Sequence, residues 1–160
     1  MARTEFTVAA ADGSCVVSLH VPAGVEKHPG VVLYPDAGGA RETFCAMGDR
    51  LAALGYVVLV PDVYYRVGRY EPFAIDTVFS DPVERGRLLD LAGTLTPAMS
   101  VADADTFVDA LTGRPEVTPG PVGTVGYCMG GRADLVDRGG VSRRASGGLR
   151  VDPWWRSGRR

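Results

Sequence analysis

The sequence predicts an α/β fold in which a mostly parallel sheet carries helices on its faces. Two short apolar runs, Gly30–Tyr34 and Tyr56–Val60, lack polar alternation, which is typical of strands buried on both faces of a parallel sheet. A helical pattern separates them, and strand–helix–strand order is the unit from which parallel sheets are built. A chain of 160 residues, 46% of them hydrophobic, can bury such a core without disulfides or metals.

The chain is expected to open with an antiparallel hairpin. Phe6–Ala9 and Cys15–Val21 have the composition of strands, and Ala11–Ser14 between them has the composition of a turn. A further short buried strand is predicted near the end of the regular pattern, over Val122–Tyr127.

Helices are predicted between these strands. After the first buried strand, apolar residues recur at steps of three and four and are followed by the stop signal Gly55; they are Phe44, Met47, Leu51 and Leu54. A second helix begins near Pro97, with Asp103, Asp105 and Asp109 assigned to its solvent face. Its apolar residues are Met99, Val101, Ala102, Phe107, Ala110 and Leu111. Between them, residues 64–80 are predicted to form a loop, and Asp81–Arg85 to begin a helix.

Charge and composition exclude several classes of protein. The net charge is −2, so the molecule has no electrostatic footprint for nucleic acid or an anionic membrane surface. No apolar run approaches the roughly 18 residues of a membrane span and no signal peptide begins the chain, so a cytoplasmic location is expected. The three cysteines lack CxxC spacing, and we predict no disulfide framework, no metal site and no cofactor.

One motif carries chemistry. Gly126–Gly131 reads Gly-Tyr-Cys-Met-Gly-Gly directly after a predicted strand and fits the cysteine form of a nucleophile elbow. Such a sharp strand-to-helix turn would place the thiol of Cys128 at a helix N-terminus, where the helix dipole favours the thiolate and the N–H of Met129 faces a developing oxyanion. The alternative is a buried cysteine in a glycine-rich turn.

The loop after the strand Gly30–Tyr34 is expected to lie beside this turn. An oxyanion hole needs a second donor from that loop, and the N–H of Ala37 is the candidate. Asp36 would lie near Cys128 and act on its proton, or would serve only as a cap or turn residue.

These residues together resemble the dienelactone hydrolase family. The resemblance covers residues 1–132 and is carried by Val-Val-Leu-Tyr-Pro-Asp-Ala-Gly-Gly, by Val-Pro-Asp-Val-Tyr-Tyr-Arg, and by Gly-Tyr-Cys-Met-Gly-Gly. It implies the N-terminal portion of an α/β-hydrolase fold and a Cys-His-Asp triad that hydrolyses a small-molecule ester or lactone through an acyl-enzyme.

The resemblance also implies roles for individual residues. Cys128 would be the nucleophile, and Asp36 would stand where the family has an acidic residue, usually Glu, that helps to generate the thiolate. The family holds a substrate carboxylate with arginines, and Arg85 and Arg87 lie in a comparable region without matching a clear motif.

The triad is not completed within the sequence. In this fold the acid and the histidine follow the nucleophile, yet both histidines, His20 and His28, precede Cys128, and we expect each to be solvated or structural. Residues 1–132 contain 10 Lys and Arg against 16 Asp and Glu, a net charge of −6, whereas residues 133–160 contain 7 against 3, a net charge of +4 and no periodic pattern. We interpret residues 133–160 as a frame-shifted, non-native or disordered tail rather than a nucleic-acid-binding arm.

A shifted reading frame accounts for the pattern of this tail. Read one base later, the codons of Val151–Arg156 permit the Ser-x-His-Gly-Gly sequence of the family, and those of Val141–Arg143 permit its Phe-Pro-Asp turn. The leading prediction is therefore an ester or lactone hydrolase that is inactive as written. The alternative is a non-catalytic thiol protein that uses Cys128 for redox sensing or ligand binding.

Overall fold

A computed structural model describes residues 1–130, which form one five-stranded mixed sheet in the order β1-β2-β4-β3-β5. The strands are β1 (Ala2–Ala10), β2 (Gly13–Val21), β3 (Gly30–Tyr34), β4 (Val57–Pro61) and β5 (Gly123–Gly126). β3 pairs in parallel with both β4 and β5, whereas β2 pairs antiparallel with β1 and β4. The predicted α/β fold is confirmed. The predicted tail, residues 133–160, and the last residue of the elbow motif, Gly131, lie outside the described residues.

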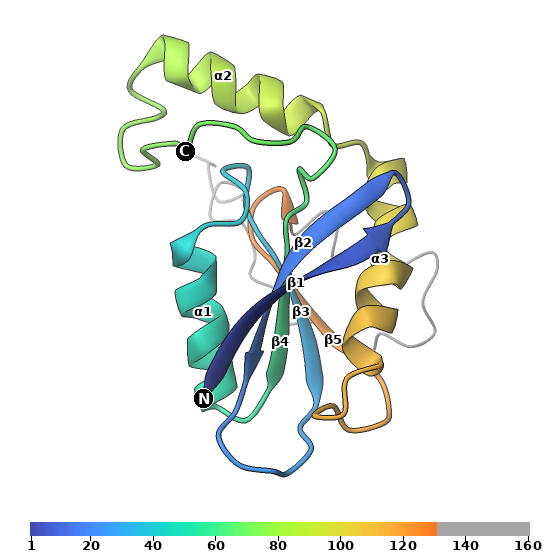
Figure 1. Ribbon diagram of the computed structural model, residues 1–160. Helices are drawn as coiled ribbons and strands as arrows, with labels where there is room; N and C mark the ends of the chain where they lie inside the picture. The colour runs from blue at the N-terminus through green and yellow to red at the C-terminus, as the bar shows by residue number, and fades with distance from the viewer. Residues whose placement is uncertain (131–160) are drawn as a thin grey trace, which may run out of the picture.

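Helices cover both faces of the sheet (Figure 1). α1 (Glu42–Ala53) packs on β2 and β4, and α3 (Pro97–Thr112) packs against β1, β3 and β4. Side chains of β3 alternate between the two layers: Val31 and Leu33 join the core that contains Phe44 of α1, while Val32 joins the core that contains Phe107 of α3. Burial on both faces explains why this strand reads as a continuous apolar run.

The third helix lies beyond the carboxyl end of the sheet. α2 (Pro82–Gly93) crosses the top of Figure 1 and begins where predicted, because the Asp81 side chain accepts hydrogen bonds from the N–H groups of Val83 and Glu84. Residues 64–80, which lead to it, contain no helix or strand, as predicted. This loop forms part of the surface above the carboxyl ends of the strands.

The opening hairpin is confirmed, with longer strands than predicted. Ala10 pairs with Gly13, so the turn contains only Ala11 and Asp12. Gly13 has a φ of 145°, a conformation that glycine adopts readily because it has no Cβ.

The assignment of Asp103 to the solvent face of α3 was wrong. Its side chain is 2% exposed and accepts hydrogen bonds from the Tyr65 hydroxyl at 2.9 Å and from Arg66 Nη1 at 2.7 Å. Asp103 precedes the buried Phe107 by one helical turn, so it lies on the inner face of α3, and the partners from the loop satisfy its charge. Asp105 and Asp109 are exposed, as predicted.

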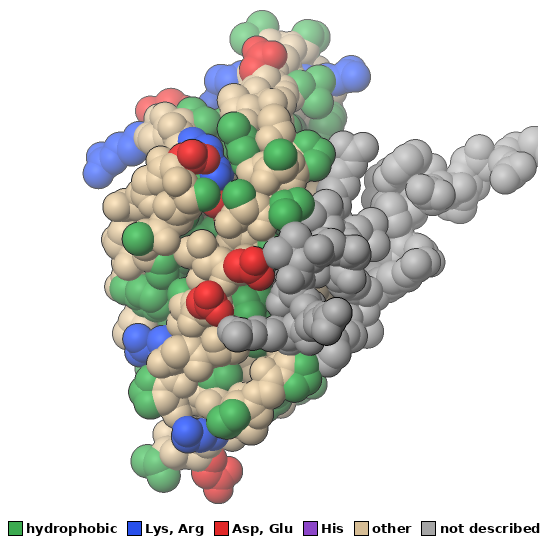
Figure 2. Space-filling model, turned by 90° about the vertical axis from the view of Figure 1, so that its right-hand side faces the viewer, with side chains coloured by type: hydrophobic (Ala, Val, Ile, Leu, Met, Phe, Trp, Pro, Cys, Tyr) green, Lys and Arg blue, Asp and Glu red, His purple; other side chains and the backbone are tan. Residues whose placement is uncertain are grey.

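Two further properties concern the surface of the described residues. No helix among residues 1–130 is both long and apolar enough to cross a membrane. On the face shown in Figure 2, the lysine and arginine side chains of the described part lie apart from one another instead of gathering into one basic patch.

Candidate active site

Cys128 lies on a strained turn just beyond the carboxyl end of β5. Its φ is 53°, in the left-handed region that non-glycine residues rarely adopt, and its side chain is exposed. The Gly130 N–H donates to the Tyr127 carbonyl at 2.8 Å and closes the turn around Cys128. The sequence-based alternative of a buried cysteine is therefore wrong for this residue.

Gly130 allows this turn to lie against the loop that follows β3. A Cβ at Gly130 would lie 2.7 Å from the Tyr34 carbonyl oxygen and would overlap that of Pro35. Such contacts with backbone atoms cannot be relieved by a side-chain rotation. The glycine thus permits the close approach of two chain segments that are far apart in sequence.

The loop after β3 is a tight turn organised by Asp36. The Asp36 carbonyl accepts from the Gly39 N–H at 2.9 Å, and its carboxylate Oδ1 accepts from the Gly38 N–H at 2.9 Å. Gly39 has a φ of 76°. The expectation that Asp36 acts as a turn residue is confirmed.

The Asp36 carboxylate is also paired with Arg41. Arg41 donates from Nη1 to Oδ1 at 2.6 Å and from Nη2 to Oδ2 at 2.9 Å, which makes the ion pair bidentate. This pairing raises the pKa of Arg41. Within residues 1–130, the hydrogen bonds of the Asp36 side chain go to Gly38 and Arg41, and none joins it to Cys128.

Both candidate oxyanion donors have available N–H groups. Among the described residues, neither the Ala37 N–H nor the Met129 N–H donates to a protein acceptor. Ala37 lies in the turn after β3 and Met129 in the turn after β5, and these two strands are hydrogen-bonded neighbours in the sheet. The two donors therefore come from adjacent strand ends.

Tyr64, a residue for which no role was predicted, links these two segments. Its hydroxyl donates to the Ala37 carbonyl at 3.0 Å and lies 3.3 Å from Met129 Sδ. Burial raises the pKa of Tyr64 well above its usual range, and the charges of Tyr70, Asp36 and Cys128 add to this effect. The signal in the sequence was the Pro-Asp-Val-Tyr run, which marks family resemblance but not this contact.

The two arginines considered for substrate binding have different environments. Arg87 donates to the Glu71 carbonyl at 2.7 Å and to Glu84 Oε2 at 2.6 Å, and its guanidinium lies 4.0 Å from the centre of the Phe73 ring. Arg87 therefore fastens α2 to the loop before it. Arg85 is exposed.

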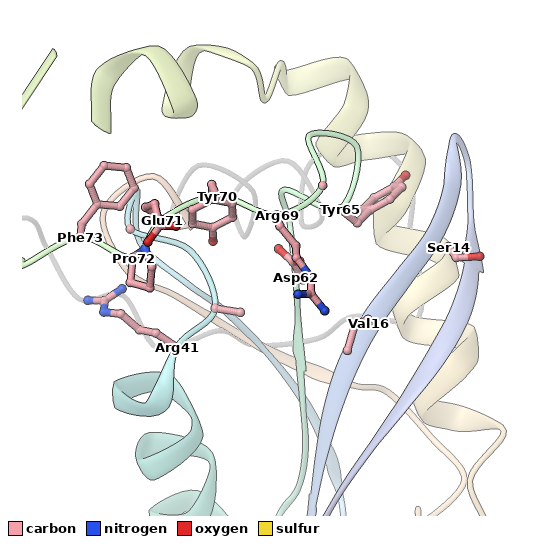
Figure 3. Close-up of a pocket in the computed structure, with 13 residues that line it drawn as sticks. Ser14, Val16, Arg41, Asp62, Tyr65, Arg69, Tyr70, Glu71, Pro72 and Phe73 are labelled. Carbon is pink, nitrogen blue, oxygen red and sulfur yellow. The ribbon is translucent and has the colours of Figure 1, made fainter. Parts of the chain in front are cut away.

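A pocket of about 640 Å³ lies between the loop after β3 and residues 68–73 (Figure 3). Arg41 stands toward one end of it, and Ser14 and Val16 of the hairpin stand toward the other. Cys128 is not one of the residues that line this pocket.

Neither histidine lies in position to serve Cys128. His20 is fully buried under α1, where its Nδ1 lies 2.7 Å from Asp49 Oδ1 and its Nε2 lies 3.1 Å from Ser18 Oγ. His28 pairs with Val117 at the amino ends of β3 and β5, opposite the end that carries Cys128. The prediction that His20 is structural is confirmed. Among residues 1–130, no group of three His, Cys, Asp or Glu side chains could hold a metal ion.

Comparison with known proteins gives a consistent result. The model of the dienelactone hydrolase family matches residues 16–142. A protein of Synechocystis sp. (strain ATCC 27184 / PCC 6803 / Kazusa), named "Putative carboxymethylenebutenolidase", is 26% identical over 110 residues, which are 69% of this chain and 43% of that protein.

Solved structures of similar proteins have the same arrangement. The structure of m3DLH is 28% identical, with a TM-score of 0.65 over 84% of this chain and 52% of that one. A dienelactone hydrolase-like promiscuous phosphotriesterase from metagenomic libraries is 29% identical, with a TM-score of 0.59 over 85% of this chain and 54% of that one. The chain thus spans about half the length of these relatives. By its family match and its sheet, the chain belongs to the dienelactone hydrolase family of α/β-hydrolases.

Proposed function

We propose that this chain carries the nucleophile and the oxyanion hole of a carboxylic-ester or lactone hydrolase of the dienelactone hydrolase type. The observation that carries the proposal is the exposed Cys128 at a φ of 53° beyond the carboxyl end of β5. Parallel α/β sheets bind ligands at this end of their strands, and a nucleophile held on such a turn stands clear of the backbone.

The chemistry is acyl transfer to sulfur. The Cys128 thiolate attacks the ester carbonyl carbon, and the carbonyl electron pair moves onto oxygen to form a tetrahedral oxyanion. The N–H groups of Met129 and Ala37 stabilise that oxyanion. Its collapse breaks the bond to the alcohol oxygen, which leaves with a proton from solvent, and a thioester on Cys128 remains.

Asp36 and the arginines have supporting roles in this proposal. Asp36 orders the turn that presents the Ala37 N–H, and it serves as a proton acceptor for Cys128 only after its carboxylate leaves Arg41. Arg85 is the remaining candidate for holding an acidic group of the substrate, since Arg87 already donates to the Glu71 backbone carbonyl and to the Glu84 carboxylate.

Turnover is expected to be slow in the 160-residue chain. Hydrolysis of the thioester needs a base to activate water, and general acid–base catalysis contributes about 10²–10⁴-fold. No histidine follows Cys128 in the sequence, and His20 is buried with bonds to both ring nitrogens. We therefore propose that, within these 160 residues, Cys128 is acylated faster than its thioester is hydrolysed.

The test is pre-steady-state hydrolysis of p-nitrophenyl acetate. We expect a burst of one p-nitrophenolate per chain, with one acetyl group on the Cys128 peptide by mass spectrometry. Cys128→Ala should abolish the burst, and Cys45→Ala, which removes a thiol within α1, should keep it. Sustained turnover by the wild type would disprove slow deacylation, and the absence of any burst would disprove the nucleophile.

A thiol sensor is the second candidate, and the exposure of Cys128 favours it. An exposed thiol on a strained turn is open to oxidation by peroxide to a sulfenic acid. The two functions can be distinguished with one protein preparation. A thiol sensor would react with dimedone at the Cys128 sulfenic acid after peroxide treatment and would not be acylated by the ester.

A further inference from the structure

Tyr64 connects the two parts of the candidate oxyanion hole. Its side chain is 1% exposed, and its hydroxyl lies between the Ala37 carbonyl, at 3.0 Å, and Met129 Sδ, at 3.3 Å. The hydroxyl has one proton, and a carbonyl oxygen is a stronger acceptor than a thioether. The proton is therefore donated to Ala37, while the sulfur of Met129 packs against the phenol oxygen.

The peptide between Ala37 and Gly38 is consequently held at both ends. Its carbonyl accepts from Tyr64 at 3.0 Å, and its N–H donates to Asp36 Oδ1 at 2.9 Å. Because a peptide unit is planar, fixing both groups fixes its orientation. The Ala37 N–H belongs to the preceding peptide and is joined to this one through a single Cα, so its direction depends on this anchorage.

The Tyr64 ring is itself fixed in place. Its backbone N–H donates to Asp62 Oδ1 at 3.0 Å, and the Tyr70 ring meets it edge-on, with centroids 5.7 Å apart. A Cβ at Gly39 would lie 3.1 Å from the Tyr64 ring and would overlap the Tyr70 hydroxyl. The ring is thus confined by the loop on which it acts.

We propose that Tyr64 is a positioning residue that sets the spacing and direction of the Ala37 and Met129 N–H groups toward one oxyanion. The role rests on the proposed function of Cys128. Burial, together with the charges of Tyr70 and Asp36, raises the pKa of the Tyr64 phenol. The hydroxyl therefore stays protonated, and remains a donor, at the pH values at which the Cys128 thiol reacts.

The test compares two reactions of Cys128 in Tyr64→Phe. Acylation by p-nitrophenyl acetate builds an oxyanion, whereas alkylation by iodoacetamide displaces iodide at a saturated carbon and builds none. Removing an oxyanion donor outright costs about 10²–10³-fold, so loss of its positioning is expected to slow acylation by about tenfold. Alkylation should keep its wild-type rate constant, because the thiol itself is unchanged.

Two further variants complete the experiment. Tyr65→Phe removes a hydroxyl that bonds Asp103 at 2.9 Å and is the matched control, with both rate constants expected to match the wild type. Met129→Leu removes the sulfur that the Tyr64 hydroxyl contacts, so the ratio of the acylation to the alkylation rate constant should fall in this variant too. This second variant tests the proposal if Tyr64→Phe folds poorly.

The outcomes separate the two proposals. If wild-type Cys128 is alkylated but not acylated, the proposed function fails, and the role of Tyr64 fails with it. If the wild type is acylated and the ratio of the two rate constants is unchanged in Tyr64→Phe and Met129→Leu, only the role of Tyr64 is overturned.

Discussion

Cys128 and Cys15 are two thiols of one chain in opposite surroundings. Cys128 is exposed on a left-handed turn beyond a strand end. Cys15 is fully buried within β2, and its Sγ lies 3.3 Å from the Asp62 carbonyl oxygen. Burial raises the pKa of the Cys15 thiol to about 12, with the negative charge of Asp62 adding to the effect. The difference shows that backbone placement, and not residue type, decides which thiol can act.

The two regions are also held together by different forces. Around Cys15, the hairpin, the loop and α3 are tied by charge: Arg66 bonds Asp103 at 2.7 Å and Asp12 at 2.7 Å. Around Cys128, two backbone segments fit closely because Gly130 has no side chain. The region around Cys15 is expected to lose stability when a charge loses its partner. The region around Cys128 is expected to lose its close fit when a methyl group is added at Gly130.

Thiol labelling should give the largest difference between the two regions. At about pH 8, a thiol with a pKa of about 12 is ionised in about one molecule in ten thousand, so Cys15 is expected to resist iodoacetamide in the folded protein. Cys128 should be alkylated readily because it is exposed. Peptide mass spectrometry against time measures both sites, and similar labelling of the two would contradict the comparison.

Breaking the charge network should cost the most stability. Asp103→Ala leaves Arg66, which is 13% exposed, without its buried partner, and we expect a loss of about 3–5 kcal/mol in the free energy of unfolding. Urea titration followed by circular dichroism measures the loss. The control is Asp105→Ala on the exposed face of the same helix, and equal effects of the two variants would count against the network.

Adding a methyl group at the elbow should cost less stability but more function. Gly130→Ala places a Cβ among backbone atoms of Tyr34 and Pro35, and overpacking of this kind costs about 1–3 kcal/mol. The Cys128 burst should fall with it. Gly86→Ala in α2, where a Cβ meets nothing within 4 Å, is the control and should stabilise the fold by about 0.5–1 kcal/mol. A normal burst in Gly130→Ala would refute the close fit.

Alkaline pH should produce the smallest effect. The pKa of Cys15 is raised on folding, so the buried thiol contributes stability that is complete below about pH 9 and is lost as the pH rises toward about 12. One pH unit above 9 corresponds to about 1 kcal/mol. The drop in unfolding free energy between about pH 8 and about pH 10 should therefore be smaller in Cys15→Ala, and equal drops would contradict the shift.

Much of the fold could be predicted from local patterns. The buried strands, α1 and the start of α2 each have a signal of their own, such as the apolar run of β3 or the Asp81-Pro82 cap. Asp103 was assigned to the solvent face because it is charged. Local periodicity could not show that the loop after β4 supplies Arg66 and Tyr65 as partners for a buried Asp103 carboxylate.

The candidate site shows the same division. The Gly-x-Cys-x-Gly spacing was sufficient to predict the turn at Cys128, and the donor role of the Met129 N–H stays a prediction. It could not show that Asp36 is paired with Arg41 or that Tyr64 reaches Ala37, because those contacts join loops across the sheet end.

The sequence by itself determined the α/β class, the family and the identity of the thiol at the turn, since each is indicated by short runs of consecutive residues. Only the tertiary structure decided which groups meet at the strand ends, which thiol is exposed and which charges are paired. The physical reason is that the parallel neighbours β3 and β5 bring the loops after Tyr34 and Gly126 side by side, and the contacts between them depend on packing in three dimensions.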